Sequence, residues 1–177
     1  MDNRIKKAIY VIHRKCLKPF AYVSNNFYQK MIVKHYKKLG MNIIGTPFYI
    51  HPDVYFDGSD YGLITLEDGC SISRDVIFLT HDFSMNTVYK GLELTNMEEL
   101  ENEYRINRLK RLHPIHVGKH TFIGARSFIL PGSDIGSNVL IGGGSVVRGK
   151  IPDNSVVMGN PAVVVKKTSE WLERKKF

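Results

Sequence analysis

One histidine stands out among the residues of this sequence that are suited to acid–base chemistry. His81 lies in Thr80-His81-Asp82, directly after the apolar residues Phe78 and Leu79. A long charged stretch follows it. Near pH 7 a neutral imidazole can take a proton from a hydroxyl group, so His81 is a candidate general base. Asp82 either orients the imidazole ring or is an exposed loop residue.

Other histidines and the two cysteines raise the options of a metal site and a nucleophile. His113, His116 and His120 are close in sequence, but the last two flank a single apolar residue and do not recur at a regular spacing. We therefore expect no metal ion. Cys70 is expected in the core, and Cys16, in a basic helix, is expected to be structural. Two cysteines do not make a disulfide framework, which favours a reducing, cytoplasmic location.

A period of six residues organises the sequence that must position these side chains. Val or Ile recurs without a slip at Val117, Ile123, Ile129, Ile135, Ile141 and Val147. Glycine follows this anchor at Gly118, Gly124, Gly136 and Gly142. A narrow hydroxyl side chain takes the fourth place after it at Thr121, Ser127, Ser133 and Ser145. The repeat predicts short strands joined by turns, with three strands closing a triangular coil of about eighteen residues.

Each part of the repeat has a physical reason. The stiff β-branched anchor packs inward on a pleated surface, and the glycine is expected to supply a turn conformation that other residues reach only with strain. Weaker repeats have anchors at Ile44, Ile50 and Phe56 and at Leu66, Ile72 and Phe78, with an extra turn near 58–62. After Val147 the register shifts at Ile151-Pro152 and resumes at Val157 and Val163.

Three segments lie outside the repeat. Residues 1–40 have helical apolar spacing that Pro19 divides, and residues 168–177 are expected to form a short helix capped by Thr168 or Ser169. Residues 82–114 are an insertion, in which Thr95-Asn96-Met97-Glu98 predicts a helix near 96–111. The insertion is too long and too charged for a plain turn, so we expect it to act as a lid or wall. The fold class is mainly β, with the β-helix over residues 41–167.

The positive charge of the chain is concentrated in its first segment. Residues 1–40 hold ten Lys or Arg and one acid, whereas the other residues hold fifteen Lys or Arg and sixteen acids. This distribution argues against a nucleic-acid-binding face on the β-helix. No apolar run approaches the ~20 residues of a membrane-spanning helix, and no signal peptide is expected.

From Ile115 to Val165, and again over residues 66–81, the sequence resembles the hexapeptide-repeat acyltransferases, in the branch of sugar O-acetyltransferases such as galactoside and maltose acetyltransferase. The motifs that carry the resemblance are Ile141-Gly142-Gly143-Gly144-Ser145-Val146-Val147, Ile151-Pro152 and Gly159-Asn160-Pro161-Ala162. The resemblance implies a left-handed parallel β-helix, a homotrimer, acetyl-CoA as the donor and His81 as the catalytic base. A period of six does not fix the handedness, which rests on the resemblance alone.

The resemblance also implies where the donor binds. It places acetyl-CoA in a groove between adjacent β-helices, where backbone groups of Ala125 and Gly143 would pair with the pantetheine amides. The cations that the family often uses for the CoA phosphates are missing at two positions. Arg148, Lys150 and Lys166 lie near those positions and are expected to substitute.

The acceptor site implied by the resemblance lies beside His81, near Asp57, Asp60 and Tyr61, although aspartates in such a segment also suit plain turns. The Asn residues expected there are not evident, so the sugar should differ from a galactoside. Three functions stay open: O-acetylation of a surface-polysaccharide sugar or its precursor, N-acetylation of a free or nucleotide-linked amino sugar, and a non-catalytic scaffold. His81 beside a loop, together with Gly143, favours an enzyme.

Residues 1–40 allow two interpretations. A basic helix with apolar residues can lie on an anionic membrane, here the inner face of the cytoplasmic membrane, where lipid-linked glycans are assembled. Alternatively, its apolar face packs on the β-helix and its cations are only solvated.

Overall fold

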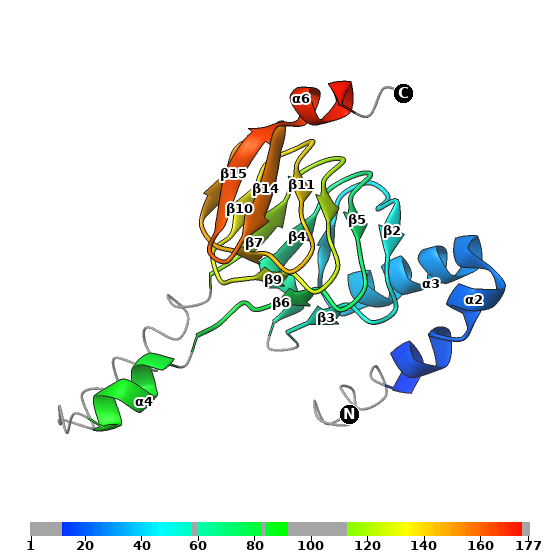
Figure 1. Ribbon diagram of the computed structural model, residues 1–177. Helices are drawn as coiled ribbons and strands as arrows, with labels where there is room; N and C mark the ends of the chain where they lie inside the picture. The colour runs from blue at the N-terminus through cyan, green and yellow to red at the C-terminus, as the bar shows by residue number, and fades with distance from the viewer. Residues whose placement is uncertain (1–11, 58–59, 83, 92–112, 175–177) are drawn as a thin grey trace.

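A computed structural model describes residues 12–57, 60–82, 84–91 and 113–174. The chain winds as a parallel β-helix through three sheets (Figure 1). The first sheet contains β1 (Asn42–Ile43), β4 (Ile64–Leu66), β7 (Ile115–Val117), β10 (Asp134–Ile135) and β13 (Lys150–Ile151). The second contains β2 (Tyr49–Ile50), β5 (Ser71–Ile72), β8 (Phe122–Ile123), β11 (Leu140–Ile141), β14 (Ser155–Gly159) and β15 (Ala162–Lys167). The third contains β3 (Tyr55–Phe56), β6 (Ile77–Phe78), β9 (Phe128–Ile129) and β12 (Val146–Val147).

The predicted anchors form the core of the β-helix. Ile123 pairs with Ile141 and Ile129 with Val147 on the next coil, so each coil takes eighteen residues here. All six predicted anchors from 117 to 147 are fully buried. The hydroxyl positions are buried beside them, and Ser127, for example, donates to the carbonyl of Gly124 at 2.8 Å. The predicted repeat is confirmed.

The glycine directly after each anchor was predicted to supply a turn conformation that other residues reach only with strain, and this prediction is wrong. The left-handed conformation falls three places after the anchor, as at His120 with φ 53° and Arg126 with φ 59°. The glycine directly after the anchor is needed because successive coils lie very close together. A Cβ on Gly118 would come within 2.6 Å of the Gly136 carbonyl carbon, which belongs to the backbone of the next coil.

Two predicted anchors do not point inward. Ile44 is 54% exposed, and the neighbouring Ile43 takes the buried place in β1. Val163 is 57% exposed because β15 turns back and pairs antiparallel with β14, which ends the winding of parallel coils. The predicted extra turn falls in a segment that contains the 3-10 helix η1 (Tyr61–Leu63).

The N-terminal helices cover the first-coil end of the β-helix (Figure 1). Residues 12–17 are helical, α2 spans Phe20–Val23 and α3 spans Asn25–Lys38, with Pro19 at the N-cap of α2. α3 buries Tyr28, Ile32 and Tyr36 against the first coil. The side chain of Gln29 also bonds both backbone groups of Ile50. The apolar face of α3 therefore packs on the β-helix, as the second interpretation of residues 1–40 predicts.

The insertion and the C-terminus carry the two remaining described helices. α4 (Ser84–Gly91) opens the insertion and projects away from the β-helix, and the sequence did not predict it (Figure 1). The predicted helix at 96–111 lies outside the described residues. α6 (Thr168–Glu173) matches the predicted C-terminal helix, but its N-cap is Lys167, and the Thr168 hydroxyl instead donates to the Asn138 carbonyl. None of the helices in the described ranges is long and apolar enough to cross a membrane.

Candidate functional site

β6 delivers His81 to one edge of the third sheet. Phe78, which ends β6, stacks on Phe56 of the coil beneath with ring centroids 4.8 Å apart. The next amide, of Leu79, still donates to the Ile129 carbonyl at 2.9 Å, and Thr80 is fully buried. The coil therefore fixes the backbone up to His81, where the chain leaves the β-helix.

Asp57 orients the imidazole of His81. It follows β3 directly on the coil beneath and is only 3% exposed. Its Oδ2 is paired with Nδ1 of His81 and accepts hydrogen bonds from the amide and hydroxyl of Thr80 at 3.0 and 2.8 Å. Because an ionised carboxylate can only accept, this pairing places a proton on Nδ1 and leaves the lone pair of the neutral ring on Nε2.

Asp57 lies in a different place from the one expected, and Asp82 takes the second of its two expected roles. Asp57 was predicted to line the acceptor site, but it lies behind His81 because β3 and β6 pair in register at Phe56 and Phe78. Asp82 is the exposed loop residue: its Oδ1 accepts from the Ser84 amide at 2.8 Å at the start of α4. That hydrogen bond lowers the pKa of Asp82. The orienting carboxylate thus comes from the preceding coil.

A cavity of about 560 Å³ opens beside His81. Its lining consists of Leu79, His81, Asp82, His113, Leu130, Pro131 and Arg148. Both ends of the insertion contribute to this lining, Asp82 at one end and His113 at the other. The amide of His113 also donates to the Thr80 carbonyl at 3.3 Å. The volume is ordinary for a small-molecule site. Sequence reasoning did not assign His113 to the site, although its place at the end of the insertion was a usable signal.

The other predicted acceptor residues do not line this cavity. Asp60 caps η1, where its Oδ1 accepts from the Gly62 amide at 2.9 Å. Tyr61 is half-buried with its ring centroid 6.0 Å from that of Tyr36, and burial raises its pKa. The structure gives both residues a place in the turn between the first two coils.

The predicted donor residues divide between the two edges of the third sheet. Ala125 precedes β9, so it lies at the edge where the parallel strands start, and Gly143 stacks on it in the next coil. His81 follows β6, at the edge where the strands end. Arg148 follows β12 and lies at the His81 edge. Exposed Lys150 is in β13, and half-buried Lys166 is in β15.

Metal and thiol chemistry find little support in the part of the chain that the structure describes. No group of three potential ligands is arranged to hold a metal ion within it. His116 instead pairs with Asp134 at 2.9 Å and lies 3.4 Å from Glu67. Cys70 is fully buried, as predicted, and burial raises the pKa of its thiol to about 12. Cys16 is exposed, which does not fit the structural role expected for it.

Comparisons with known proteins agree with the repeat. Residues 114–149 match the family described as bacterial transferase hexapeptide (six repeats). A Staphylococcus aureus (strain COL) protein, provisionally named an acetyltransferase, is 33% identical over 135 residues, covering 76% of this chain and 57% of that protein. An Escherichia coli (strain K12) protein, provisionally named a lipopolysaccharide biosynthesis O-acetyl transferase, is 29% identical over 109 residues, covering 62% and 56%. The chain thus spans less than three fifths of the length of these relatives.

One solved structure supports the architecture. A galactoside acetyltransferase in complex with coenzyme A aligns over 100% of this chain and 88% of its own, with a TM-score of 0.54 and 19% identity. At that identity the likeness shows a shared fold.

Proposed function

The chain belongs to the hexapeptide-repeat transferases and has their left-handed parallel β-helix, and from this premise we propose that it is an acetyl-CoA-dependent O-acetyltransferase acting on a sugar hydroxyl. The observation that carries the proposal is the buried Asp57 carboxylate paired with His81 at the wall of a cavity. That arrangement provides a positioned general base, which this reaction requires.

We propose that the acetyl group is transferred directly from acetyl-CoA to the sugar. With Nδ1–H held by Asp57, Nε2 of His81 takes the proton of the sugar hydroxyl as its oxygen attacks the thioester carbonyl carbon. When the tetrahedral intermediate collapses, the carbon–sulfur bond breaks and the imidazolium returns its proton to the CoA thiolate. The products are the sugar acetyl ester and CoA, and Asp57 remains ionised throughout and stabilises the imidazolium.

A second subunit completes the site in this proposal. His81 and the Ala125–Gly143 edge lie on opposite sides of the third sheet, so one chain does not bring them together. The outward side chains of this sheet are apolar, and Tyr55 and Phe128 are 52% and 40% exposed. Packing this face around a threefold axis would bury them and set the His81 edge of one subunit against the donor edge of the next. A homotrimer closes that heterologous contact.

Acetyl-CoA would then lie along the edge formed by Ala125 and Gly143. Neither amide nitrogen donates to a backbone carbonyl within the described ranges, so both are available to the pantetheine arm and to the developing oxyanion. Arg148 lies at the His81 edge, facing this groove across the subunit contact, and supplies positive charge for the phosphates. We assign Lys150 and Lys166 the same role.

The acceptor would occupy the cavity between His81 and the ends of the insertion. His113 and Asp82, at its wall, are placed to bond sugar hydroxyls. The E. coli relative's name supports a sugar of a surface polysaccharide or its precursor as the acceptor class. Such precursors are assembled at the inner face of the cytoplasmic membrane, which is where we place the enzyme. Asp60 and Tyr61 would contribute only if a polymeric acceptor extends beyond the cavity.

An acceptor screen tests the proposal. Purified protein and acetyl-CoA are incubated with sugars, amino sugars and nucleotide-linked sugars, and CoA release is followed with a thiol reagent. We expect release that depends on a hydroxyl acceptor and is lost in His81→Ala. Acetylation confined to amino groups would support the N-acetyltransferase alternative, and no turnover with any acceptor class would contradict the proposal.

A further inference from the structure

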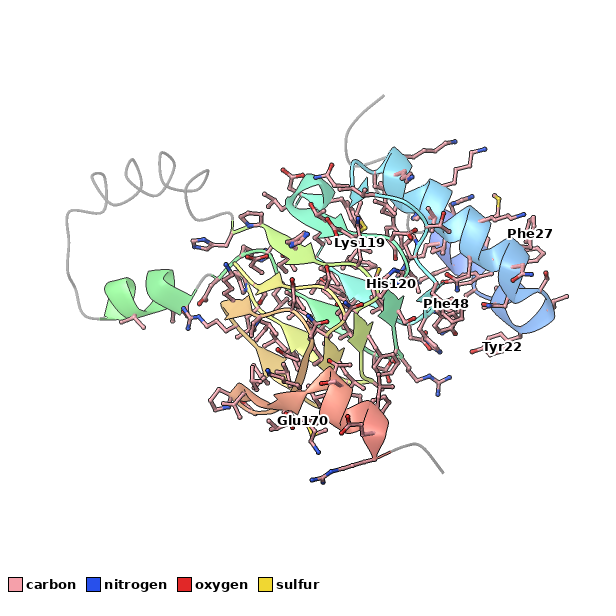
Figure 2. The ribbon with its side chains drawn as sticks, turned by 90° about the horizontal axis from the view of Figure 1, so that it is seen from above. Tyr22, Phe27, Phe48, Lys119, His120 and Glu170 are labelled. Carbon is pink, nitrogen blue, oxygen red and sulfur yellow. The ribbon has the colours of Figure 1, made fainter. Side chains whose placement is uncertain are left out.

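Five large apolar side chains lie exposed together at the first-coil end of the molecule. Phe20, Tyr22 and Val23 of α2 are 45%, 70% and 83% exposed, Phe27 of α3 is 46% exposed, and Phe48, between β1 and β2, is 77% exposed. Figure 2 shows Tyr22, Phe27 and Phe48 gathered at this end, well away from Glu170 of α6. We call these five residues the apolar end, and we propose that it binds the surface of an anionic lipid bilayer.

The apolar end is not needed for packing the helices. α3 uses its opposite face, with Tyr28, Ile32 and Tyr36, to cover the β-helix. Phe20 and Phe27 contact each other with ring centroids 5.4 Å apart, which holds α2 against α3. The outer faces of both rings remain exposed. The apolar end is therefore a different surface from the face of α3 that packs on the β-helix.

The charged side chains that the helices at the apolar end carry are all positive. No acid occurs from residue 3 to residue 52. Lys15, Lys30 and Lys34 are exposed in the helices, and Lys30 and Lys34 lie three and seven places after Phe27, along one stripe of α3. Lys18 is the exception, because Asp53 holds it in an ion pair. Helices that carry only positive charges beside exposed aromatic rings match an anionic interface, where aromatic rings settle among the headgroups.

A cleft beside Phe48 gives the surface depth. Its volume is about 620 Å³, and its lining residues include Asn25, Asn26, Lys30 and Phe48. Amide and ammonium groups donate hydrogen bonds to phosphate and carboxylate oxygens. A lipid headgroup therefore has hydrogen-bond donors in the residues that line the cleft beside Phe48.

A second copy of this chain fits the apolar end less well. Self-association through it would bring together the exposed lysines of two sets of helices, and these helices carry no acid to neutralise them. An anionic bilayer satisfies both the apolar side chains and the charge. The inference does not depend on the proposed enzymatic reaction, and its test uses no substrate.

Sedimentation of the full chain with vesicles tests the inference. Vesicles with 30% anionic lipid are compared with neutral vesicles, at low and at high salt, and we expect salt-sensitive binding to the anionic vesicles only. Tyr22→Ser/Val23→Ser/Phe48→Ser should abolish it. Lys15→Gln/Lys30→Gln should weaken partitioning by roughly twenty- to thirty-fold, since each cation near such a surface is worth about a factor of five.

Matched variants control for lost surface area and lost charge. Val164→Ser/Val165→Ser/Leu172→Ser removes three side chains that are 48%, 47% and 52% exposed at the other end, and Lys167→Gln/Arg174→Gln removes two exposed cations there. Both should bind vesicles like the unchanged protein. Equal loss in the controls, or absence of binding to anionic vesicles at low salt, would overturn the inference. A smaller assembly mass for the apolar-end variant in lipid-free light scattering would also overturn it, by assigning the surface to a contact between copies.

Discussion

Nδ1 of His81 and Oδ2 of Asp57 are paired between successive coils, at the point where the chain leaves the β-helix. The carboxylate is buried and also holds the amide and hydroxyl of Thr80, so the imidazole has a single tautomer and a fixed plane. A side chain held in this way loses little further entropy when it takes part in catalysis.

His81→Ala removes the proposed base. We expect kcat to fall by about 10²–10⁴-fold, the usual contribution of general base catalysis, with little change in CoA affinity. Steady-state kinetics and CoA titration measure the two quantities separately. Turnover near the rate of the unchanged protein would show that His81 is not the base.

Asp57→Asn tests the orienting role. The amide is nearly isosteric but can donate to Nδ1, which favours the tautomer with its proton on Nε2 and so blocks proton acceptance at the cavity. We expect kcat to fall by about 10²–10⁴-fold while the acceptor KM stays similar. Asp134→Asn is the matched control, because its carboxylate also pairs with a histidine, His116, but lies outside the cavity of His81. If the two variants behave alike, Asp57 has no special place in the reaction.

The sequence predicted the anchors well because a period of six repeats one physical requirement at every coil. The six-residue spacing alone predicts anchors such as Ile129 and Val147. Asp57 could not be placed in this way, because its position behind His81 depends on how the first coil, with its extra turn at η1, stacks on the second. Ile44 was chosen over Ile43 for the same reason: the first coil departs from the six-residue spacing. The orienting carboxylate of the site therefore comes from the irregular first coil, which the six-residue spacing does not describe.

Gly118→Ala tests the corrected role of the repeat glycines. The new Cβ would meet the backbone of Gly136 and Ser137 at 2.6 to 2.7 Å, and a backbone cannot rotate away as a side chain can. We expect a loss of about 1–3 kcal/mol in the free energy of unfolding, measured by urea denaturation. Gly149→Asn is the control, since φ is 73° there and nothing lies within 4 Å. A larger loss of unfolding free energy in Gly149→Asn than in Gly118→Ala would show that backbone conformation, and not the close approach of successive coils, is the reason for the repeat glycines.

His35 gives the fold an acid-sensitive point. Burial, with the nearby charges of His13 and Arg14, lowers its pKa from 6.5 to about 4. The unfolded chain then binds a proton more readily between these values, so this contribution to stability is present above pH 6.5 and is lost as the pH falls toward 4. Its size is at most about 3 kcal/mol. Urea denaturation between pH 7 and pH 4.5 should show a decline that His35→Gln reduces, and an equal decline in that variant would contradict the assignment.

Mixing two inactive variants tests whether each site is shared between subunits. His81→Ala lacks the base but keeps the donor edge. Gly143→Trp keeps His81 but fills the space through which acetyl-CoA would reach the backbone beside Ala125. If each site takes His81 from one subunit and the donor edge from the next, random exchange of the two chains in a closed ring restores about a quarter of the sites.

The exchange is made by mild denaturation and joint refolding, with each variant refolded alone as the control. Recovered CoA release near a quarter of that of the unchanged protein supports the shared site. Light scattering should give the mass of three chains for both variants, because both keep the apolar face that carries Phe128, which the contact would bury. Activity that stays at the level of the separate variants, with mixed trimers verified by mass spectrometry, would place His81 and the donor edge of one site within one chain.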